Sequence, residues 1–125
     1  IIGSNDEEGL TFFKVQKDAK QTLPAEPAVL SATNAQLGQS VIALDGEVKN
    51  NISIGRIISV DQNAQNAKEI RIIQTDIAAK PVVLGAPALN LSGEIIGLRT
   101  TLGETAQSFI TAAVIKRVMK DYPVR

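Results

Sequence analysis

The 125-residue sequence contains no histidine and no cysteine. Without cysteine the chain can form no disulfide, and it offers neither a thiolate nucleophile nor a thiolate metal ligand. Without histidine it lacks the usual general base near neutral pH and the commonest ligand of transition metals. We therefore expect no bound metal and no cofactor, and groups of this chain alone could not activate a serine nucleophile in the usual way.

Aromatic residues and unbalanced charge are scarce as well. Phe, Tyr and Trp make up 3% of the sequence, and 13 Lys and Arg residues balance 13 Asp and Glu residues. A neutral chain with few aromatic rings offers little electrostatic attraction and few stacking surfaces for nucleic acid. No apolar run approaches the roughly 18 residues of a membrane-spanning helix, and no signal peptide is visible. We predict neither a nucleic-acid partner nor a membrane contact for this segment.

The residues that are present are typical of one folded, β-rich domain. Hydrophobic residues make up 44% and charged residues 21% of the sequence, and 125 residues suit a single domain. Runs rich in valine, isoleucine or aromatic residues predict strands at residues 10–15, 40–44, 52–60 and 70–75. The polar residues 61–68 predict an exposed loop.

The last third of the sequence predicts a hairpin and a helix. Two apolar runs flank Ser92 and Gly93, a pair suited to a tight turn, so we expect residues 88–98 to form a β-hairpin. Thr111 is a suitable N-cap for a helix that Pro123 would end. The apolar face of this helix is predicted from residues at helical spacing: Ile115, Val118, Met119 and Tyr122.

Several short motifs, in order along the chain, resemble those of the trypsin-like domain of the HtrA (Deg) serine proteases. Residues 37–44 (LGQSVIAL) are similar to the strand that begins the family's second β-barrel. Residues 73–76 (IQTD) resemble the motif that leads into its nucleophile loop, and residues 89–97 (LNLSGEIIG) resemble the hairpin that follows. The resemblance covers nearly the whole chain.

This resemblance implies an all-β fold: the second six-stranded antiparallel β-barrel of a trypsin-like fold, with remnant strands of the first barrel and one C-terminal α-helix. We expect the remnant strands at residues 1–16, a linker at residues 17–36, and the barrel with its terminal helix at residues 37–125. The sequence begins with Ile1 rather than methionine, so we also expect it to be a processed or engineered form, or a fragment of something longer. The family implies an extracytoplasmic location, in the periplasm or cell envelope.

The same alignment places inert residues at two catalytic positions of the family. Leu84 stands where the family has its nucleophilic serine, and Gly9 stands where it has the acidic member of the triad. Leucine has no heteroatom to attack a carbonyl, and glycine cannot orient an imidazole. Val82 and Val83 replace residues of the oxyanion-hole loop, and β-branched side chains resist the positive φ that such a loop needs. We therefore predict that the protein is not an enzyme.

The candidate binding residues lie beside the nucleophile position and just past the hairpin: Val82, Val83, Leu84, Gly85, Arg99 and Thr100. For Leu84 the alternatives are ordinary core packing or an apolar contact for a bound peptide. Arg99, Thr100 and Thr101 either border the groove that binds substrate in the family or form an exposed polar edge. The carboxylates of Asp6, Glu7 and Glu8 are interpreted as a solvated turn, because the alternating ligand spacing of a calcium loop is absent.

These observations predict a catalytically inactive homologue that serves as a peptide- or protein-binding scaffold module. The strand edge beside the nucleophile loop receives an extended peptide in this fold, and that edge can persist without the chemistry. The alternative is a purely structural half-domain of a larger, membrane-anchored or regulatory protein whose function lies elsewhere. A single barrel would expose the face that meets the first barrel, so we expect it to associate with an N-terminal barrel or with another copy.

Overall fold

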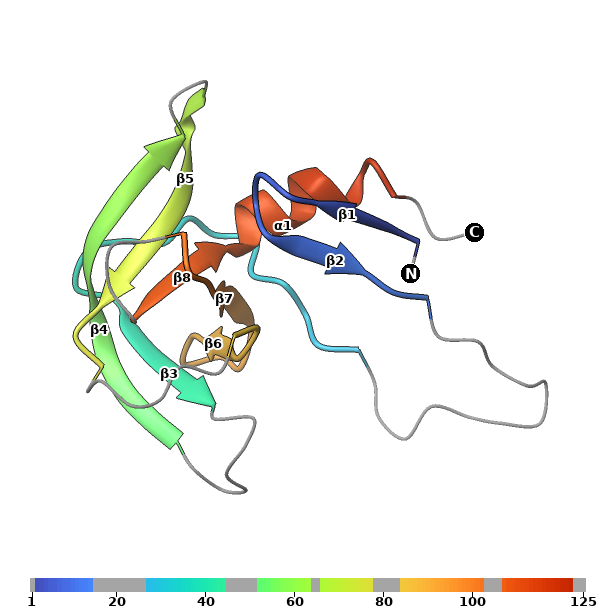
Figure 1. Cartoon of the computed structure of the whole chain (residues 1–125). Coiled ribbons are helices and arrows are strands. Elements are labelled where there is room, and N and C mark those ends of the chain that lie inside the picture. The colour runs from blue at the N-terminus through green and yellow to red at the C-terminus, as the bar shows by residue number, and fades with distance from the viewer. Residues whose placement is uncertain are drawn as a thin grey trace, which may run out of the picture.

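The computed structural model describes residues 2–14, 27–44, 52–63, 66–77, 84–102 and 107–122. Six strands form a closed antiparallel barrel in the order β3-β4-β5-β8-β7-β6, and a separate two-stranded hairpin and one helix lie beside it (Figure 1). The strands are β1 Gly3–Asn5, β2 Leu10–Phe12, β3 Ser40–Leu44, β4 Ile52–Asn63, β5 Asn66–Thr75, β6 Pro87–Leu89, β7 Ile95–Arg99 and β8 Ser108–Thr111, and the helix is α1 Ala112–Met119. The predicted all-β barrel with one terminal helix is confirmed.

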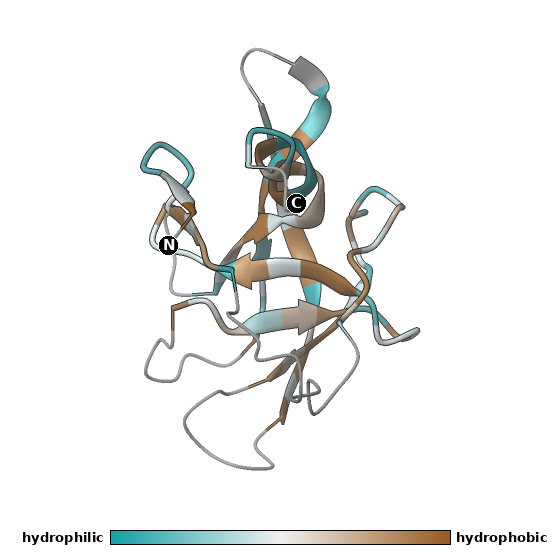
Figure 2. Ribbon diagram, turned by 90° about the vertical axis from the view of Figure 1, so that its right-hand side faces the viewer, coloured by the Kyte–Doolittle hydropathy of each residue, from teal (hydrophilic) through white to brown (hydrophobic). Residues whose placement is uncertain are grey.

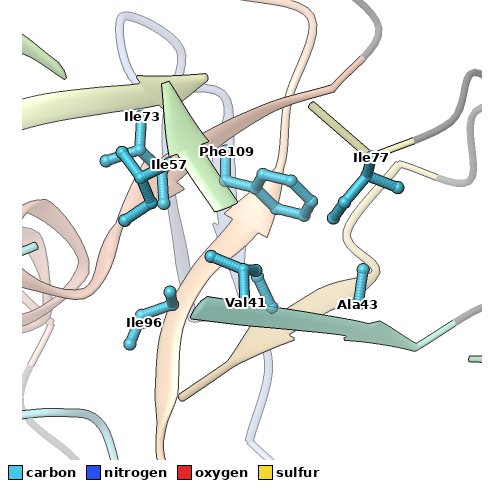
Figure 3. Close-up of a cluster of buried hydrophobic side chains, with 8 residues drawn as sticks. Val41, Ala43, Ile57, Ile73, Ile77, Ile96 and Phe109 are labelled. Atoms are coloured by element: carbon cyan, nitrogen blue, oxygen red, sulfur yellow. The ribbon is translucent and has the colours of Figure 1, made fainter. Parts of the chain in front are cut away.

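The barrel interior is filled by aliphatic side chains around one phenylalanine. Phe109, Val41 and Ile73 are fully buried there, and Ile57, Ile77, Ile96 and two alanines complete the cluster (Figure 3). On β3 the buried residues alternate with half-buried ones, as expected for a strand with one face on a core. Strand β8 is buried throughout, because its outer face is covered as well. Apolar residues concentrate in the strands of the barrel and polar residues at its turns (Figure 2).

A second apolar cluster joins the barrel, the helix and the hairpin. Ile110 on the outer face of β8, Val114 and Val118 on α1 and Leu10 on β2 are its buried members, together with Ile115. The hairpin and α1 therefore lie side by side on one flank of the barrel (Figure 1). This contact buries apolar surface of the hairpin that two strands alone could not bury.

The terminal helix agrees in part with its prediction. Thr111 is the N-cap, and its Oγ1 accepts a hydrogen bond of 3.4 Å from the Val114 amide. Ile115 and Val118 are buried as predicted, but Met119 is 45% exposed and the prediction of its burial is wrong. The predicted apolar face is therefore confirmed at Ile115 and Val118, whereas Tyr122 lies beyond the end of the helix. There the Tyr122 ring stacks on Phe12 with 5.2 Å between centroids, and its hydroxyl donates to the Ser4 carbonyl. Pro123 lies outside the described residues.

The segment between the hairpin and the barrel is held against β7 where it is described. Ser31 donates its amide hydrogen to the Ile95 carbonyl, and Ile95 donates to Val29, both at 2.8 Å. Lys116 on α1 donates to the Ser31 carbonyl at 2.8 Å. The predicted boundaries at residues 16 and 36 stay a prediction, because residues 15–26 lie outside the described part.

The polar segment that was expected to be a loop is part of a long two-stranded ribbon. Strand β4 runs to Asn63 and β5 begins at Asn66, with pairs such as Asp61–Ile72 between them. The loop prediction for residues 61–68 is therefore wrong over most of its length. Asp61 and Gln62 are exposed on this ribbon, so their polarity reflects solvent contact rather than the absence of a strand.

Candidate functional site

A pocket of about 240 Å³ lies between the β1–β2 hairpin and the end of β7. Six of the residues singled out in the sequence as site positions line it: Gly9, Leu84, Gly85, Arg99, Thr100 and Thr101. Val82 and Val83 lie outside the described residues. The pocket also includes residues that were not predicted to line it: Asp6, Leu10, Leu98, Leu102 and Ile110. Of these, Leu98 and Leu102 had a signal in the sequence, namely their position next to the predicted residues 99–101.

Leu84 and Gly85 form one wall of this pocket. Leu84 is 61% exposed, so its interpretation as core packing is wrong. Gly85 has a φ of +85°, a conformation that L-residues with side chains rarely adopt. Its amide donates to the Arg99 carbonyl at 3.0 Å, and the Arg99 amide donates to the Ala86 carbonyl at 2.9 Å. These two bonds fix the position of Leu84 at the pocket although its side chain is not packed in the core.

A second wall is the chain that continues from β7. Thr100 is buried, and its amide donates to the Ser108 carbonyl at 3.1 Å. The Thr100 hydroxyl accepts a hydrogen bond of 3.1 Å from the Leu102 amide. Thr101 between them is exposed, and its backbone forms no hydrogen bond with any residue in the described part of the chain. Within the described part of the chain, Thr101 thus presents an unpaired backbone N–H and C=O at the edge of the pocket, between two residues whose amides are already bonded.

Arg99 is the charged residue of the pocket that comes from the barrel. It is half-buried, and its guanidinium carbon lies 5.2 Å from the centre of the Phe109 ring. Its Nε is buried and has no hydrogen-bond partner among the described residues. Because Arg99 is half-buried and Thr100 is buried, their interpretation as part of an exposed polar edge is wrong, whereas Thr101 is exposed.

The hairpin wall of the pocket is fixed by ion pairs. The Glu8 carboxylate accepts a hydrogen bond of 2.9 Å from Arg71 on β5 and one of 3.2 Å from Arg117 on α1. Arg117 also pairs with Glu69 on β5 at 3.0 Å. Glu8 is only 4% exposed, so the interpretation of residues 6–8 as a solvated turn is wrong for this residue.

This network neutralises its own charge. Two carboxylates face two guanidinium groups, and each guanidinium reaches at least one of them directly. The pKa of Arg117 is raised above its ordinary value. The main cause is the hydrogen bond with Glu69, and burial of the guanidinium acts in the opposite direction. The network has no free carboxylate for a ligand, and we assign it the role of holding the hairpin against β5 and α1.

Comparison with known protein families identifies the family to which the chain belongs. The trypsin-like peptidase domain matches residues 1–98, which include the hairpin, the pocket wall at Leu84 and the turn at Ser92 and Gly93. The chain belongs to the trypsin-like peptidase domain family. The resemblance to HtrA proteases noted in the sequence is confirmed, and the closed barrel agrees with a trypsin-like domain.

Similar proteins of this family are named serine proteases. The chain is 32% identical over 82% of its length to "Putative serine protease HhoA" of Synechocystis sp.. It is 26% identical over 97% of its length to "Serine endoprotease DegS" of Haemophilus influenzae, and 24% identical over 88% to a "Probable periplasmic serine endoprotease DegP-like" of Hahella chejuensis. The chain spans 27%, 39% and 23% of the length of these relatives, respectively.

The prediction that the protein is not an enzyme is contradicted by these comparisons, since the family is a peptidase family and its named members are serine proteases. The prediction treated 125 residues as sufficient to decide the activity. The chain spans less than half of each of these relatives, so its own composition does not decide the activity of a whole protein of this kind. The alignment of Leu84 and Gly9 with triad positions was based on short motifs and stays a prediction.

The described residues contain no helix that is both long and apolar enough to cross a membrane. Nor do they bring together three or more His, Cys, Asp or Glu residues in a way that could hold a metal ion.

Proposed function

We propose that this chain forms the peptide-binding barrel of a trypsin-like peptidase domain and binds an extended polypeptide along residues 100–102. The observation that carries the proposal is the unpaired Thr101 backbone beside a pocket of about 240 Å³. An extended peptide can satisfy such a segment by adding a strand to it, because main-chain hydrogen bonds supply affinity without demanding a particular sequence.

The pocket favours an apolar side chain of that peptide. Leu84 is 61% and Leu102 38% exposed, and both line the pocket with the half-buried Leu98. Burying apolar surface against these leucines contributes about 25 cal/mol per Å². Side chains of a bound strand alternate in direction, so one residue would enter the pocket while its two neighbours point away from it.

The named relatives support an extended polypeptide as the ligand. Two of them are called endoproteases, and the name of one places it in the periplasm. We extend both features to this chain as proposals: a polypeptide ligand and an extracytoplasmic location.

Fluorescence anisotropy tests the proposal with a labelled heptapeptide AAVQAAA that carries a C-terminal amide. We expect saturable binding to the 125-residue chain, with about tenfold loss in Leu84→Lys, because a charge would enter the apolar wall. Thr101→Pro should weaken binding as well, since proline removes the backbone N–H. Leu91→Lys is the matched control, because Leu91 is 77% exposed in the β6–β7 turn. No binding to the wild type, or equal binding to all four proteins, would contradict the proposal.

A second candidate is association with another copy of the chain, and it rests on the outer face of β4. Ile52, Ile54 and Ile58 are 56%, 75% and 58% exposed on that strand. Residues at even spacing on a strand project to one face, so these three isoleucines form a row of exposed side chains that Arg56 interrupts between Ile54 and Ile58. Exposed apolar side chains on one face of a strand are typical of a contact with another protein.

A further inference from the structure

We propose that Arg99 is a carboxylate-recognition residue that makes this barrel prefer an acidic residue in the bound peptide. The inference rests on the proposed function, because it assigns a preference to the same site. It names the ligand chemistry, a carboxylate held by a guanidinium, and predicts where in the peptide that carboxylate stands.

The strand register determines where the Arg99 side chain points. Arg99 pairs with Phe109 and Leu98 pairs with Ile110 between β7 and β8. Directly opposed residues of an antiparallel pair project to the same face of the sheet. Phe109 belongs to the core inside the barrel, whereas Ile110 and Leu98 belong to the cluster shared with α1 and the hairpin. Arg99 thus points toward the interior at the end of β7, on the opposite side from Leu98.

The environment of this guanidinium is incomplete without an anion. In the part of the chain that the structure describes, its Nε is buried and has no partner, and a buried donor that has lost its hydrogen bond to water needs an acceptor. The ring of Phe109 contacts the guanidinium at 5.2 Å but supplies no acceptor in the plane of the nitrogens. The planar fork of an arginine matches a carboxylate, which can accept two parallel hydrogen bonds from it.

The other arginines that the structure describes do not share this state. Arg71 and Arg117 both pair with Glu8, and Arg117 also pairs with Glu69, so their charges are already compensated. Arg56 is exposed on β4, where water can solvate it. Arg99 alone among these four combines a buried nitrogen with the absence of an acceptor.

Because successive side chains of a bound peptide strand point to opposite sides, the site predicts a pair of adjacent residues in the peptide. A peptide strand along residues 100–102 places one apolar side chain in the pocket between Leu84 and Leu98. The neighbouring residue of the peptide points to the opposite side, which is the side of Arg99. Asp6 also lines the pocket, and its negative charge disfavours a carboxylate there. The preferred ligand therefore has an acidic residue directly next to an apolar one.

The first experiment compares peptides by anisotropy with the 125-residue chain. In AAVQAAA amide, glutamate is placed directly after the valine in one peptide and directly before it in another. We expect one of these to bind about tenfold more tightly than its glutamine counterpart. Arg99→Gln should abolish that difference, and Arg99→Lys should reduce it, because lysine keeps the charge but loses the fork. Arg56→Gln removes the same charge from an exposed site and should leave the difference intact.

A second pair of peptides identifies the source of the carboxylate. The peptide AAAAAV is prepared once with a free C-terminal carboxylate and once as its C-terminal amide, and the affinities of the two forms are compared. A tenfold preference for the free acid that depends on Arg99 would assign the site to a peptide C-terminus, and a preference confined to glutamate would assign it to a side chain. Either result supports carboxylate recognition by Arg99.

A third measurement does not depend on strand addition. N-acetylglutamate at about 100 mM should raise the melting temperature of the wild type and of Arg56→Gln, but not that of Arg99→Gln, because a ligand that binds only the folded state stabilises it. N-acetylglutamine amide, which carries no carboxylate, is the neutral control. If peptides bind but glutamate and glutamine are equivalent in every protein, the inference is overturned while the proposed function stands. If no peptide binds, the melting curves decide, and equal shifts in wild type and Arg99→Gln overturn the inference.

Discussion

Gly97 is the residue at which β7 and β8 approach one another too closely for a side chain. A Cβ built there would lie 2.6 Å from the Ile110 carbonyl oxygen and 3.1 Å from the Phe109 Cβ. Gly97→Ala would force the two strands apart in a packed region, which typically destabilises a protein by about 1–3 kcal/mol. Urea unfolding measures the change. The control is Ser92→Ala, which places an alanine in the exposed β6–β7 turn and should leave the urea midpoint unchanged. An unchanged urea midpoint in Gly97→Ala would show that the two strands can separate without cost.

Thr111 combines two interactions in one buried hydroxyl. It accepts from the Val114 amide as the N-cap of α1, and it donates to the Ile70 carbonyl on β5. Thr111→Ala removes both bonds, so we expect a loss of about 1–2 kcal/mol. Thr111→Ser keeps the hydroxyl and serves as the control. Thermal unfolding followed by circular dichroism distinguishes them, and equal melting temperatures for the two variants would argue against a role of the hydroxyl.

Some residue-level predictions succeeded because their cause is local. The N-cap at Thr111 depends on the chain within three residues of it, and the sequence contains that information. The burial of Glu8 could not be predicted in this way, because its partners Arg71 and Arg117 lie 63 and 109 residues further along the chain. The exposure of Leu84 agrees with only one of its two interpretations, the apolar contact for a peptide, and the sequence could not decide between them, since a leucine in an apolar run is usually buried.

At the scale of elements, the Glu8 network connects three of them. It joins the β1–β2 hairpin to β5 and α1 through Arg71 and Arg117. Glu8→Gln would leave two partly exposed guanidinium groups without their shared carboxylate, and we expect a loss of about 1–3 kcal/mol. The loss should appear first as faster amide exchange in the hairpin, because α1 keeps its own packing on the barrel. Glu7→Gln, at an exposed neighbour, is the control; similar exchange in both variants would exclude a role of the network in docking the hairpin.

Elements were predicted correctly where their cause is local and were missed where pairing with a distant strand decides the structure. The hairpin at 88–98 was predicted from its turn, and the structure contains β6 and β7 there with Asn90 accepting hydrogen bonds from the Ser92 and Glu94 amides. The ribbon of β4 and β5 was missed over residues 61–68, because its pairing compensates for a polar composition. Propensity describes how a strand fits its surroundings, and a ribbon with solvent on both sides accepts polar residues.

At the scale of the whole molecule, the barrel is closed and has one interior core, while a second cluster attaches the hairpin and α1 to its flank. The family fold was predictable, since motifs spread along the chain agreed in their order. The pocket was predictable only in part, because it forms where the hairpin turn lies near the end of β7, and the sequence does not indicate that Asp6 and Leu10 line the same pocket as residues 99–101.

The outer face of β4 leads to a prediction about assembly. Ile54 is 75% exposed in this row, between Ile52 and the exposed Arg56. If two copies associate through this face, multi-angle light scattering should give a mass that rises from that of one chain toward that of two as concentration increases. Ile54→Lys should abolish the rise, because burying an unpaired charge opposes contact. Leu37→Lys, at a residue that is 65% exposed but outside the row, should not. A strictly monomeric wild type at high concentration would exclude association between copies and leave the peptide as the proposed partner of this barrel.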